Sequence, residues 1–185
     1  GDSMKVVADG SRGREHALAA TLGRTCDVVV TPGNPGISNS VPDDPETIEA
    51  DLYVIGPEQP LVDGLADRLR AAGKLVFGPG ADGAQLEGSK AYMKELLVEA
   101  GVPTAAHGTF TDEAAALEFL DQMTSPYVIK TDGLAGGKGV LVTESLDEAR
   151  QAVRRYLSGA AFGAAGRTLI VEEGLSGPEI SVFAI

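Results

Sequence analysis

The residues with the clearest chemistry lie between positions 130 and 140, where the chain reads KTDGLAGGKGV. Four glycines fall between positions 133 and 139, and they remove Cβ atoms where a backbone could wrap an anion with its N–H groups. Lys130 and Lys138 flank these glycines and could set two ammonium charges against a triphosphate. The pattern predicts a phosphate-binding loop. A surface hairpin with two solvated lysines is the competing interpretation.

This loop is not a Walker A motif. That motif requires glycine at the position of Asp132 and serine or threonine at the position of Gly139. The residues that follow, Val140-Leu141-Val142, predict a strand rather than a helix. We therefore expect a glycine-rich hairpin between two strands, which would cover a nucleotide's phosphates instead of cradling them from below.

A second group of polar residues follows a buried strand near position 170. The backbone after Glu172 and Glu173 could hydrogen-bond an adenine edge, and Glu179 could accept from ribose hydroxyls. Carboxylates that are simply solvated at the end of a strand would give the same pattern. In isolation this segment leaves both interpretations open.

A third candidate is the loop ADGSRG at positions 8–13, which lies between a predicted strand and a predicted helix. It matches A-x-G-x-x-G, but Thr31-Pro32-Gly33 stands where a dinucleotide site needs an acidic residue, so NAD binding is disfavoured. The helix N-terminus still suits a simple phosphate. His16, inside that helix, is expected to be a packed or exposed histidine unless its surroundings show otherwise.

The bulk properties exclude several classes of protein. A net charge of −12 argues against a nucleic-acid partner, and no apolar run approaches the roughly 20 residues of a membrane helix. Cys26 is the only cysteine, so neither an intrachain disulfide nor a thiolate metal cluster can form. The default expectation is a cytoplasmic protein with small-molecule substrates and no membrane partner, and with a monomer as the default oligomeric state.

Alternating apolar runs and amphipathic stretches in the first half predict an α/β fold with a doubly wound parallel sheet. Strands are predicted at 5–8, 27–31, 52–55 and 75–77, and helices at 14–22 and 62–72. A boundary is expected near positions 101–104. It separates an N-terminal βαβ substrate-binding domain (4–101) from a smaller α+β unit (104–185).

The second half starts with a helix capped by Ser89, whose predicted apolar face is Met93, Leu96, Leu97 and Ala100. Thr111 is expected to cap the next helix, and Ser145 with Glu148 forms a capping box for a third. Strands are predicted at 127–130, 140–143, 168–172 and 180–185.

Taken together, these motifs resemble the phosphoribosylamine–glycine ligase family of the ATP-grasp superfamily. The matching stretches occur in the family's order and span nearly the whole chain; they are GREHAL at 13–18, PGNPG at 32–36, GPE at 56–58, QLEGSK at 85–90, the loop at 130–140, AFG at 161–163, and Glu172-Glu173 with Glu179. The glycine-rich loop would fit other ATP-grasp ligases, whereas the two front motifs favour this family. The resemblance implies an ATP-grasp lid subdomain followed by the start of the ATP-grasp core, incomplete at residue 185.

The resemblance implies the ligation of glycine to 5-phosphoribosylamine in purine biosynthesis, with ATP cleaved to ADP and phosphate through a glycyl phosphate. It assigns Lys130 and Lys138 to catalysis. The implied ATP-binding residues are Lys90, Lys130, Gly136, Gly137, Lys138, Gly139, Glu172, Glu173, Leu175 and Glu179. The implied phosphoribosylamine-binding residues are Gly10, Gly13, Asn34, Gly36 and Glu58. Mg²⁺ is implied as well, with ligands expected beyond Ile185, so residues 1–185 alone are not expected to catalyse the reaction.

Some positions depart from the family pattern. Arg12 stands where the family usually has glycine, and Asp9 where it usually has an apolar or small residue. Between Gly36 and Asp51 the chain is shorter than the family by about one strand or helix. Two alternatives stay open, namely another ATP-grasp carboxylate–amine ligase and a nucleotide-binding module without catalysis.

Overall fold

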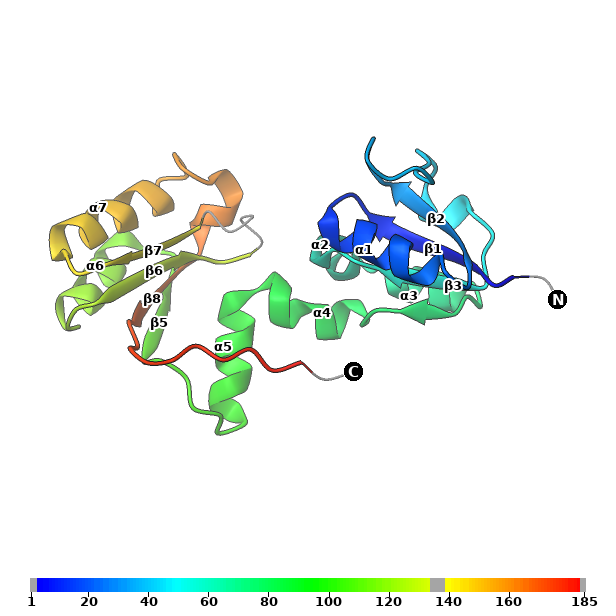
Figure 1. The fold of residues 1–185 in the computed structure, drawn as a ribbon. Helices are drawn as coiled ribbons and strands as arrows, with labels where there is room; N and C mark the ends of the chain where they lie inside the picture. The colour runs from blue at the N-terminus through cyan, green and yellow to red at the C-terminus, as the bar shows by residue number, and fades with distance from the viewer. Residues whose placement is uncertain (1–2, 134–138, 184–185) are drawn as a thin grey trace. The chain divides into compact units, whose positions relative to one another are not determined.

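The structure is a computed structural model that describes residues 3–133 and 139–183, with the side chains of residues 165 and 166 left undescribed. It divides into two compact units, Gly1–Gly88 and Ser89–Ile185 (Figure 1). The sequence suggested a boundary near positions 101–104, one helix later. The two boundaries differ because the helix that starts at Lys90 belongs to the second unit. Its N-terminal end is hydrogen-bonded to Asp132 of that unit.

The first unit is an α/β unit built on a parallel sheet with the order β2-β1-β3-β4. Its strands are β1 (Lys5–Gly10), β2 (Asp27–Pro32), β3 (Leu52–Ile55) and β4 (Val76–Phe77). Its helices are α1 (Gly13–Leu22), α2 (Glu58–Val62), α3 (Leu65–Ala71) and α4 (Ala81–Gly88). Helix α4 is absent from the sequence-based prediction.

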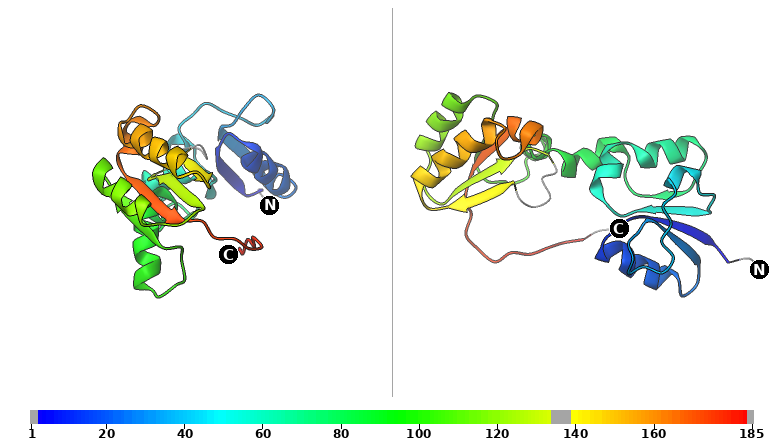
Figure 2. Two further views of the ribbon diagram at one scale, coloured as in Figure 1. Left: turned by 90° about the vertical axis from the view of Figure 1, so that its left-hand side faces the viewer. Right: turned by 90° about the horizontal axis from the view of Figure 1, so that it is seen from above.

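Helices cover both faces of this sheet, as a doubly wound fold requires (Figure 2). On one face, Val6 and Ala8 of β1 pack with Ala19 of α1. On the other face, Val7 packs with Leu65, Leu69 and neighbouring residues of α2, α3 and α4. The strands read as nearly continuous apolar runs because both of their faces are buried.

The crossover from β2 to β3 is unusual for a parallel sheet. Such a connection normally carries a helix that covers a face of the sheet. Here its regular structure is the 3₁₀ turn η1 (Pro45–Thr47), whose N-cap Asp44 accepts from Glu46 N at 2.8 Å. This short crossover agrees with the expectation that the chain is abbreviated between Gly36 and Asp51.

Strand β1 runs two residues further than expected and carries Asp9 into the sheet. Asp9 pairs in register with Thr31 of β2 and Ile55 of β3, and it is only 7% exposed. Burial, together with the negative charges of Glu15 and Asp44, raises the pKa of Asp9 from 3.8 to about 6. The sheet therefore holds a carboxyl group where an apolar residue would be the ordinary choice.

The second unit contains an antiparallel sheet with the order β5-β8-β6-β7 among the described strands. Its elements are α5 (Lys90–Glu99), β5 (His107–Phe110), α6 (Glu113–Asp121), β6 (Tyr127–Thr131), β7 (Val140–Thr143), α7 (Leu146–Leu157), η2 (Gly163–Arg167) and β8 (Leu169–Glu173). Helices α6 and α7 pack on one face, with Leu120, Val153 and Tyr156 against Ile129 and Leu169. Figure 2 shows the two helices on the same side of the strands.

The helix caps match the sequence-based expectations in part. Ser89 and Ser145 cap α5 and α7 as predicted, by accepting from Tyr92 N and Glu148 N. The prediction that Thr111 caps α6 is wrong by one residue, because the side chain of Asp112 accepts from Ala115 N at 2.9 Å. Strand β5 was not predicted from the sequence.

Two further expectations are wrong. Residues 180–183 form no strand, and Ile180, Val182 and Phe183 are at least 80% exposed, so in the described part of the chain they have no strand to pair with. The predicted apolar face of α5 is not buried either. Leu96 is 38% exposed, and the buried residue of this helix is Lys94.

The raised pKa of Asp9 predicts a pH dependence of stability. The folded protein holds this proton more tightly than the unfolded chain, so the free energy of unfolding should fall as the pH rises from about 4 to about 6. Asp9→Asn should remove this loss, which is on the order of 3 kcal/mol. Urea unfolding of the wild type and the variant from pH 4 to pH 7 measures the difference. Parallel pH profiles for the two proteins, or an equal effect of Asp27→Asn at an exposed site, would contradict the assignment.

The core of the second unit gives a second prediction. Leu120 is fully buried, so Leu120→Ala should lower the free energy of unfolding by about 2–5 kcal/mol. The control, Val98→Ala on the exposed side of α5, should change it by no more than about 0.5 kcal/mol. Far-UV circular dichroism in urea suits this measurement because the chain has no tryptophan. Equal losses for both variants would show that Leu120 is not a core residue.

Candidate functional site

The second unit places Lys130 and Glu172 on the face of its sheet that faces away from α6 and α7. In β8, Leu169 and Val171 belong to the helix-covered core, so the alternation of side chains turns Glu172 to the other face. In β6 the same alternation turns Lys130 to that face, and strands β6 and β8 are neighbours. The Nζ atom of Lys130 forms an ion pair with Oε1 of Glu172.

A second lysine reaches the same carboxylate from α5. Lys94 Nζ lies 2.7 Å from Glu172 Oε2, and both side chains are only 6% exposed. Lys94 Nζ also donates to Thr104 Oγ1 at 2.7 Å. Two ammonium groups therefore share one buried carboxylate, and the cluster carries an excess of positive charge.

The two lysines keep Glu172 ionised. Burial alone would raise the pKa of Glu172, but hydrogen bonds from Lys130 and Lys94 hold it below its usual value. Removing one member of a buried ion pair leaves an uncompensated charge, so such clusters hold their geometry firmly. Lys94 was missed from the sequence. The one sequence feature that could have indicated Lys94 is its i, i+4 spacing from Lys90, which places the two lysines on the same face of a helix.

The start of α5 is tied to the segment after β6 through Asp132. Ser89 Oγ donates to Asp132 Oδ2 at 3.0 Å, and Asp132 Oδ1 accepts from Gly133 N at 2.9 Å. Lys90 Nζ donates to the carbonyl oxygen of Gly133 at 2.7 Å. Lys90 and the first residues of the glycine-rich loop are therefore neighbours, as the predicted phosphate site requires. Asp132, which performs this anchoring, was not singled out from the sequence.

The rest of the loop is described only at its ends. Gly136, Gly137 and Lys138 lie outside the described residues. Gly139 is buried, and its carbonyl accepts from Thr131 N at 2.8 Å, which closes the base of the hairpin. The hydroxyl of Thr131 is buried and has no hydrogen-bond partner among the described residues.

The remaining predicted nucleotide residues occupy the end of β8 and the segment that follows. Glu173 exchanges two hydrogen bonds with Ala106, from its backbone N to Ala106 O and from Ala106 N to its carboxylate, each 3.0 Å long. Leu175 is 73% exposed and Glu179 is also exposed, in a stretch without regular structure. The carboxylate of Glu172 is engaged by the two lysines. Contacts of these four residues with a nucleotide remain a prediction.

The first unit brings the predicted substrate residues together around a buried glutamate. Glu15, 1% exposed, accepts from Arg12 N at 2.8 Å and from Arg14 Nε at 3.0 Å. A Cβ atom on Gly10 or Gly56 would collide with the Glu15 side chain, and Gly10 has φ +133°. Gly10 of this loop and Gly56, which follows β3, therefore make room for a carboxylate of the protein itself.

Asn34 and Gly36 lie beside this loop. Asn34 Nδ2 donates to Ser11 O at 2.9 Å, while its Oδ1 accepts from Gly36 N at 2.8 Å. On the other side, Glu58 accepts from Arg14 Nη1 at 3.1 Å. The main contribution to the lowered pKa of Glu58 is a hydrogen bond from its own backbone, with a further one from Arg14. The pattern-based grouping of these residues thus corresponds to a spatial cluster, and its role in binding remains a prediction.

Two other expectations concern histidine and metal. His16 is exposed on α1, which agrees with its interpretation as an ordinary surface residue. Within residues 3–133 and 139–183, no group of three or more His, Cys, Asp or Glu side chains is arranged to hold a metal ion. In the same ranges, no helix has the length and apolarity needed to cross a membrane.

Comparison with known proteins gives two family matches that together cover residues 4–185. Residues 4–87 match the phosphoribosylglycinamide synthetase N domain, and residues 88–185 match the ATP-grasp (A) domain of the same enzyme. Phosphoribosylamine–glycine ligase of Xanthomonas campestris pv. campestris is 44% identical over 200 residues, which cover 98% of this chain and 46% of the relative. This chain has 185 residues, so the relative carries residues that have no counterpart here. The chain spans less than half the length of this relative.

Solved structures agree with these matches. Phosphoribosylamine–glycine ligase of Thermotoga maritima superposes with a TM-score of 0.81 at 31% identity, covering 94% of this chain and 44% of that one. N5-carboxyaminoimidazole ribonucleotide synthetase, solved as an ADP complex, gives a TM-score of 0.68 at 19% identity, covering 94% of this chain and 48% of that one. The second likeness supports the ATP-grasp fold alone. With both halves matched in order and at this level of identity, the chain belongs to the phosphoribosylglycinamide synthetase family.

Proposed function

We propose that this chain takes part in the ATP-dependent ligation of glycine to 5-phosphoribosylamine, the reaction for which its relatives are named. The observation that carries the proposal is the pair of lysines around Glu172. A protein with a net charge of −12 concentrates ammonium groups on one sheet face, beside the start of a glycine-rich loop. Such a local excess of positive charge suits the phosphates of a nucleotide.

The reaction needs an activated carboxylate, because a free carboxylate is a poor electrophile. The γ-phosphoryl group of ATP passes to a glycine carboxylate oxygen, giving glycyl phosphate and ADP. The amine of phosphoribosylamine then attacks the carbonyl carbon, phosphate leaves, and the new amide nitrogen loses a proton. The role of the protein is mainly positioning and charge neutralisation during phosphoryl transfer. Mg²⁺ would add to that neutralisation, with ligands that the described residues do not provide.

Within this scheme Lys130 contacts the ATP phosphates, with Glu172 as its internal counter-ion. Lys94 lies behind Glu172 and keeps the carboxylate in place, so Lys130 does not have to neutralise it alone. Lys90 meets the phosphates from the start of α5, and Lys138, which lies outside the described residues, contacts them as well. The Gly10–Gly13 loop, Asn34 and Glu58 receive the phosphoribosylamine. A cytoplasmic location fits these small, soluble substrates.

The nucleotide assignment predicts that Lys130→Ala weakens ATP binding about 10- to 150-fold, because a charge-assisted contact is worth roughly 1.5–3 kcal/mol. Isothermal titration of the full-length gene product with ATP measures the change. Lys74→Ala is the matched control, since Lys74 pairs with Glu49 in the first unit and should leave the affinity unchanged. An unaltered affinity in Lys130→Ala would remove Lys130 from the nucleotide site.

The reaction assignment is tested by coupled ADP release from the same full-length protein. Release should require both glycine and phosphoribosylamine, and it should fall to background when glycine is replaced by D-alanine or bicarbonate. Turnover with another carboxylate in place of glycine would favour a different ATP-grasp ligase. Nucleotide binding without turnover on any of these acids would favour a module that binds ATP without catalysis.

A further inference from the structure

A cavity of the first unit is lined by residues other than those assigned to phosphoribosylamine, although Asp9 directly precedes Gly10 in the chain. It has a volume of about 430 Å³, and Asp9 and Thr31 line it from strands β1 and β2. The segment around η1 and residues of α2 and α3 form the remaining walls. This is the place that the β2–β3 crossover leaves without a helix.

The charge of this cavity is strongly negative. Its titratable lining residues are Asp9, Asp43, Asp44, Glu46, Asp63 and Arg68. The guanidinium of Arg68 is already engaged, with Nε 3.1 Å from Glu46 Oε1 and Nη1 2.7 Å from the carbonyl of Asp63. Five acidic residues therefore line the cavity beside one cation. Three of their carboxylates are themselves engaged, Glu46 by Arg68, Asp44 by the backbone N of Glu46, and Asp63 by Gln59 Nε2. A phosphate-bearing substrate would be repelled from this cavity.

Asp9 gives the cavity a feature that a solvated acidic surface lacks. Asp9 is only 7% exposed as a whole residue, and within the described part of the chain its carboxylate makes no hydrogen bond or ion pair, while its oxygens still reach solvent. A carboxylate held in this way is costly unless a donor or a cation reaches it. Glu15, the neighbouring buried carboxylate, shows the contrast, because it is paired with Arg14 and with the backbone of Arg12.

The remaining walls indicate the type of cation. They are apolar, formed by Pro32, Pro42, Pro45, Pro60 and Leu65. No group of three or more acidic or His/Cys side chains in the described ranges has the spacing to hold a metal ion. Carboxylates separated by apolar walls are complementary to ammonium groups joined by a short hydrocarbon chain.

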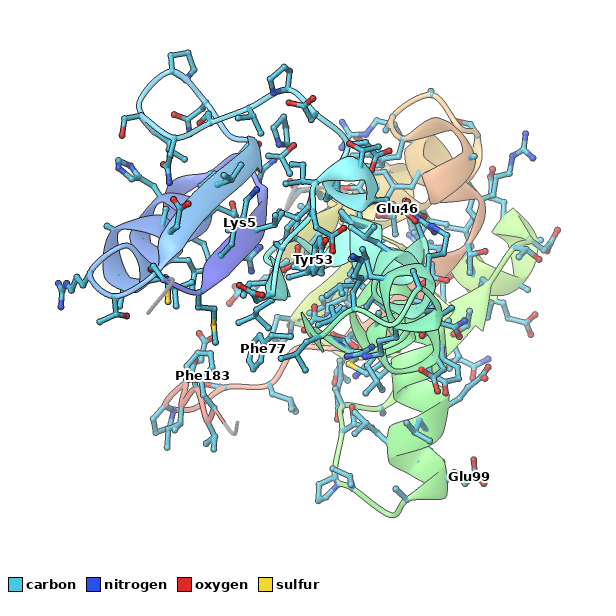
Figure 3. All side chains as sticks on the ribbon, turned by 90° about the vertical axis from the view of Figure 1, so that its right-hand side faces the viewer. Lys5, Glu46, Tyr53, Phe77, Glu99 and Phe183 are labelled. Atoms are coloured by element: carbon cyan, nitrogen blue, oxygen red, sulfur yellow. The ribbon has the colours of Figure 1, made fainter. Side chains whose placement is uncertain are left out.

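We propose that this cavity binds an aliphatic diamine, with one ammonium group on Asp9 and the other on the carboxylates at the rim. The segment around η1, which carries the rim carboxylates, is held in place because the hydroxyl of the fully buried Tyr53 donates to the carbonyl of Ile48, just after η1. Figure 3 labels Tyr53, and also Glu46 on η1. The site does not rest on the proposed ligase reaction, and its residues differ from those assigned to phosphoribosylamine.

The test is isothermal titration of the 185-residue chain at pH 8 with 1,4-diaminobutane. Saturable binding of one molecule per chain is expected, and Asp9→Asn should weaken it tenfold or more, which is about the loss of one charge-assisted contact. Asp27→Asn removes the same charge from an exposed site on β2 and should bind like the wild type. 1,4-Butanediol, of equal length but without charge, should not bind.

Three results would overturn the proposal. These are the absence of saturable binding, equal weakening by Asp27→Asn and Asp9→Asn, and binding of the diol as tightly as the diamine. Asp43→Asn, at the exposed rim, keeps the test decisive if Asp9→Asn does not fold. It should weaken diamine binding about two- to fivefold, and no weakening in that variant would count against the site.

Discussion

The second unit depends on one interaction, the buried carboxylate of Glu172 between Lys94 and Lys130. It joins a helix, α5, to the sheet face that α6 and α7 leave uncovered. An ion pair in such a place is stable only while both partners stay, so it fixes the position of Lys130 more strictly than apolar packing would. The same arrangement leaves positive charge in excess on an acidic protein, and under the proposed function that excess would attract the phosphates of a nucleotide.

The first unit uses a buried carboxylate in a related way. Glu15 holds the loop that precedes its own helix by accepting from Arg12 N and Arg14 Nε, and the glycines at 10 and 56 give it space. In the first unit the glycines at these two positions have a steric purpose that can be located, because they allow a charged group of the protein to lie against the backbone. Arg12 is accommodated because it uses its backbone N–H here while its side chain stays exposed.

The sequence predicted the elements whose signal is local. Apolar runs located the described strands of both sheets except β5, and Ser89 and Ser145 marked helix starts, because burial on two faces and N-capping act within a few residues. It missed features that depend on distant partners. Lys94 looks like a surface residue until Glu172, far along the chain, is known to face it. Residues 180–183 have strand composition, but a strand also needs a neighbour, and a local pattern cannot supply one.

The buried carboxyl group of Asp9 and the short crossover between β2 and β3 are structurally related. In a parallel sheet, a full helix between β2 and β3 would cover the face on which Asp9 and Thr31 lie, and a carboxylate buried under it would have to remain protonated or be replaced by an apolar residue. With only η1 in that crossover, a cavity opens over the same residues, and an ionisable group is tolerated there although its pKa is raised to about 6. The buried carboxyl group of Asp9 and the short crossover therefore belong to one local arrangement, in which Asp9 forms the floor of an acidic cavity.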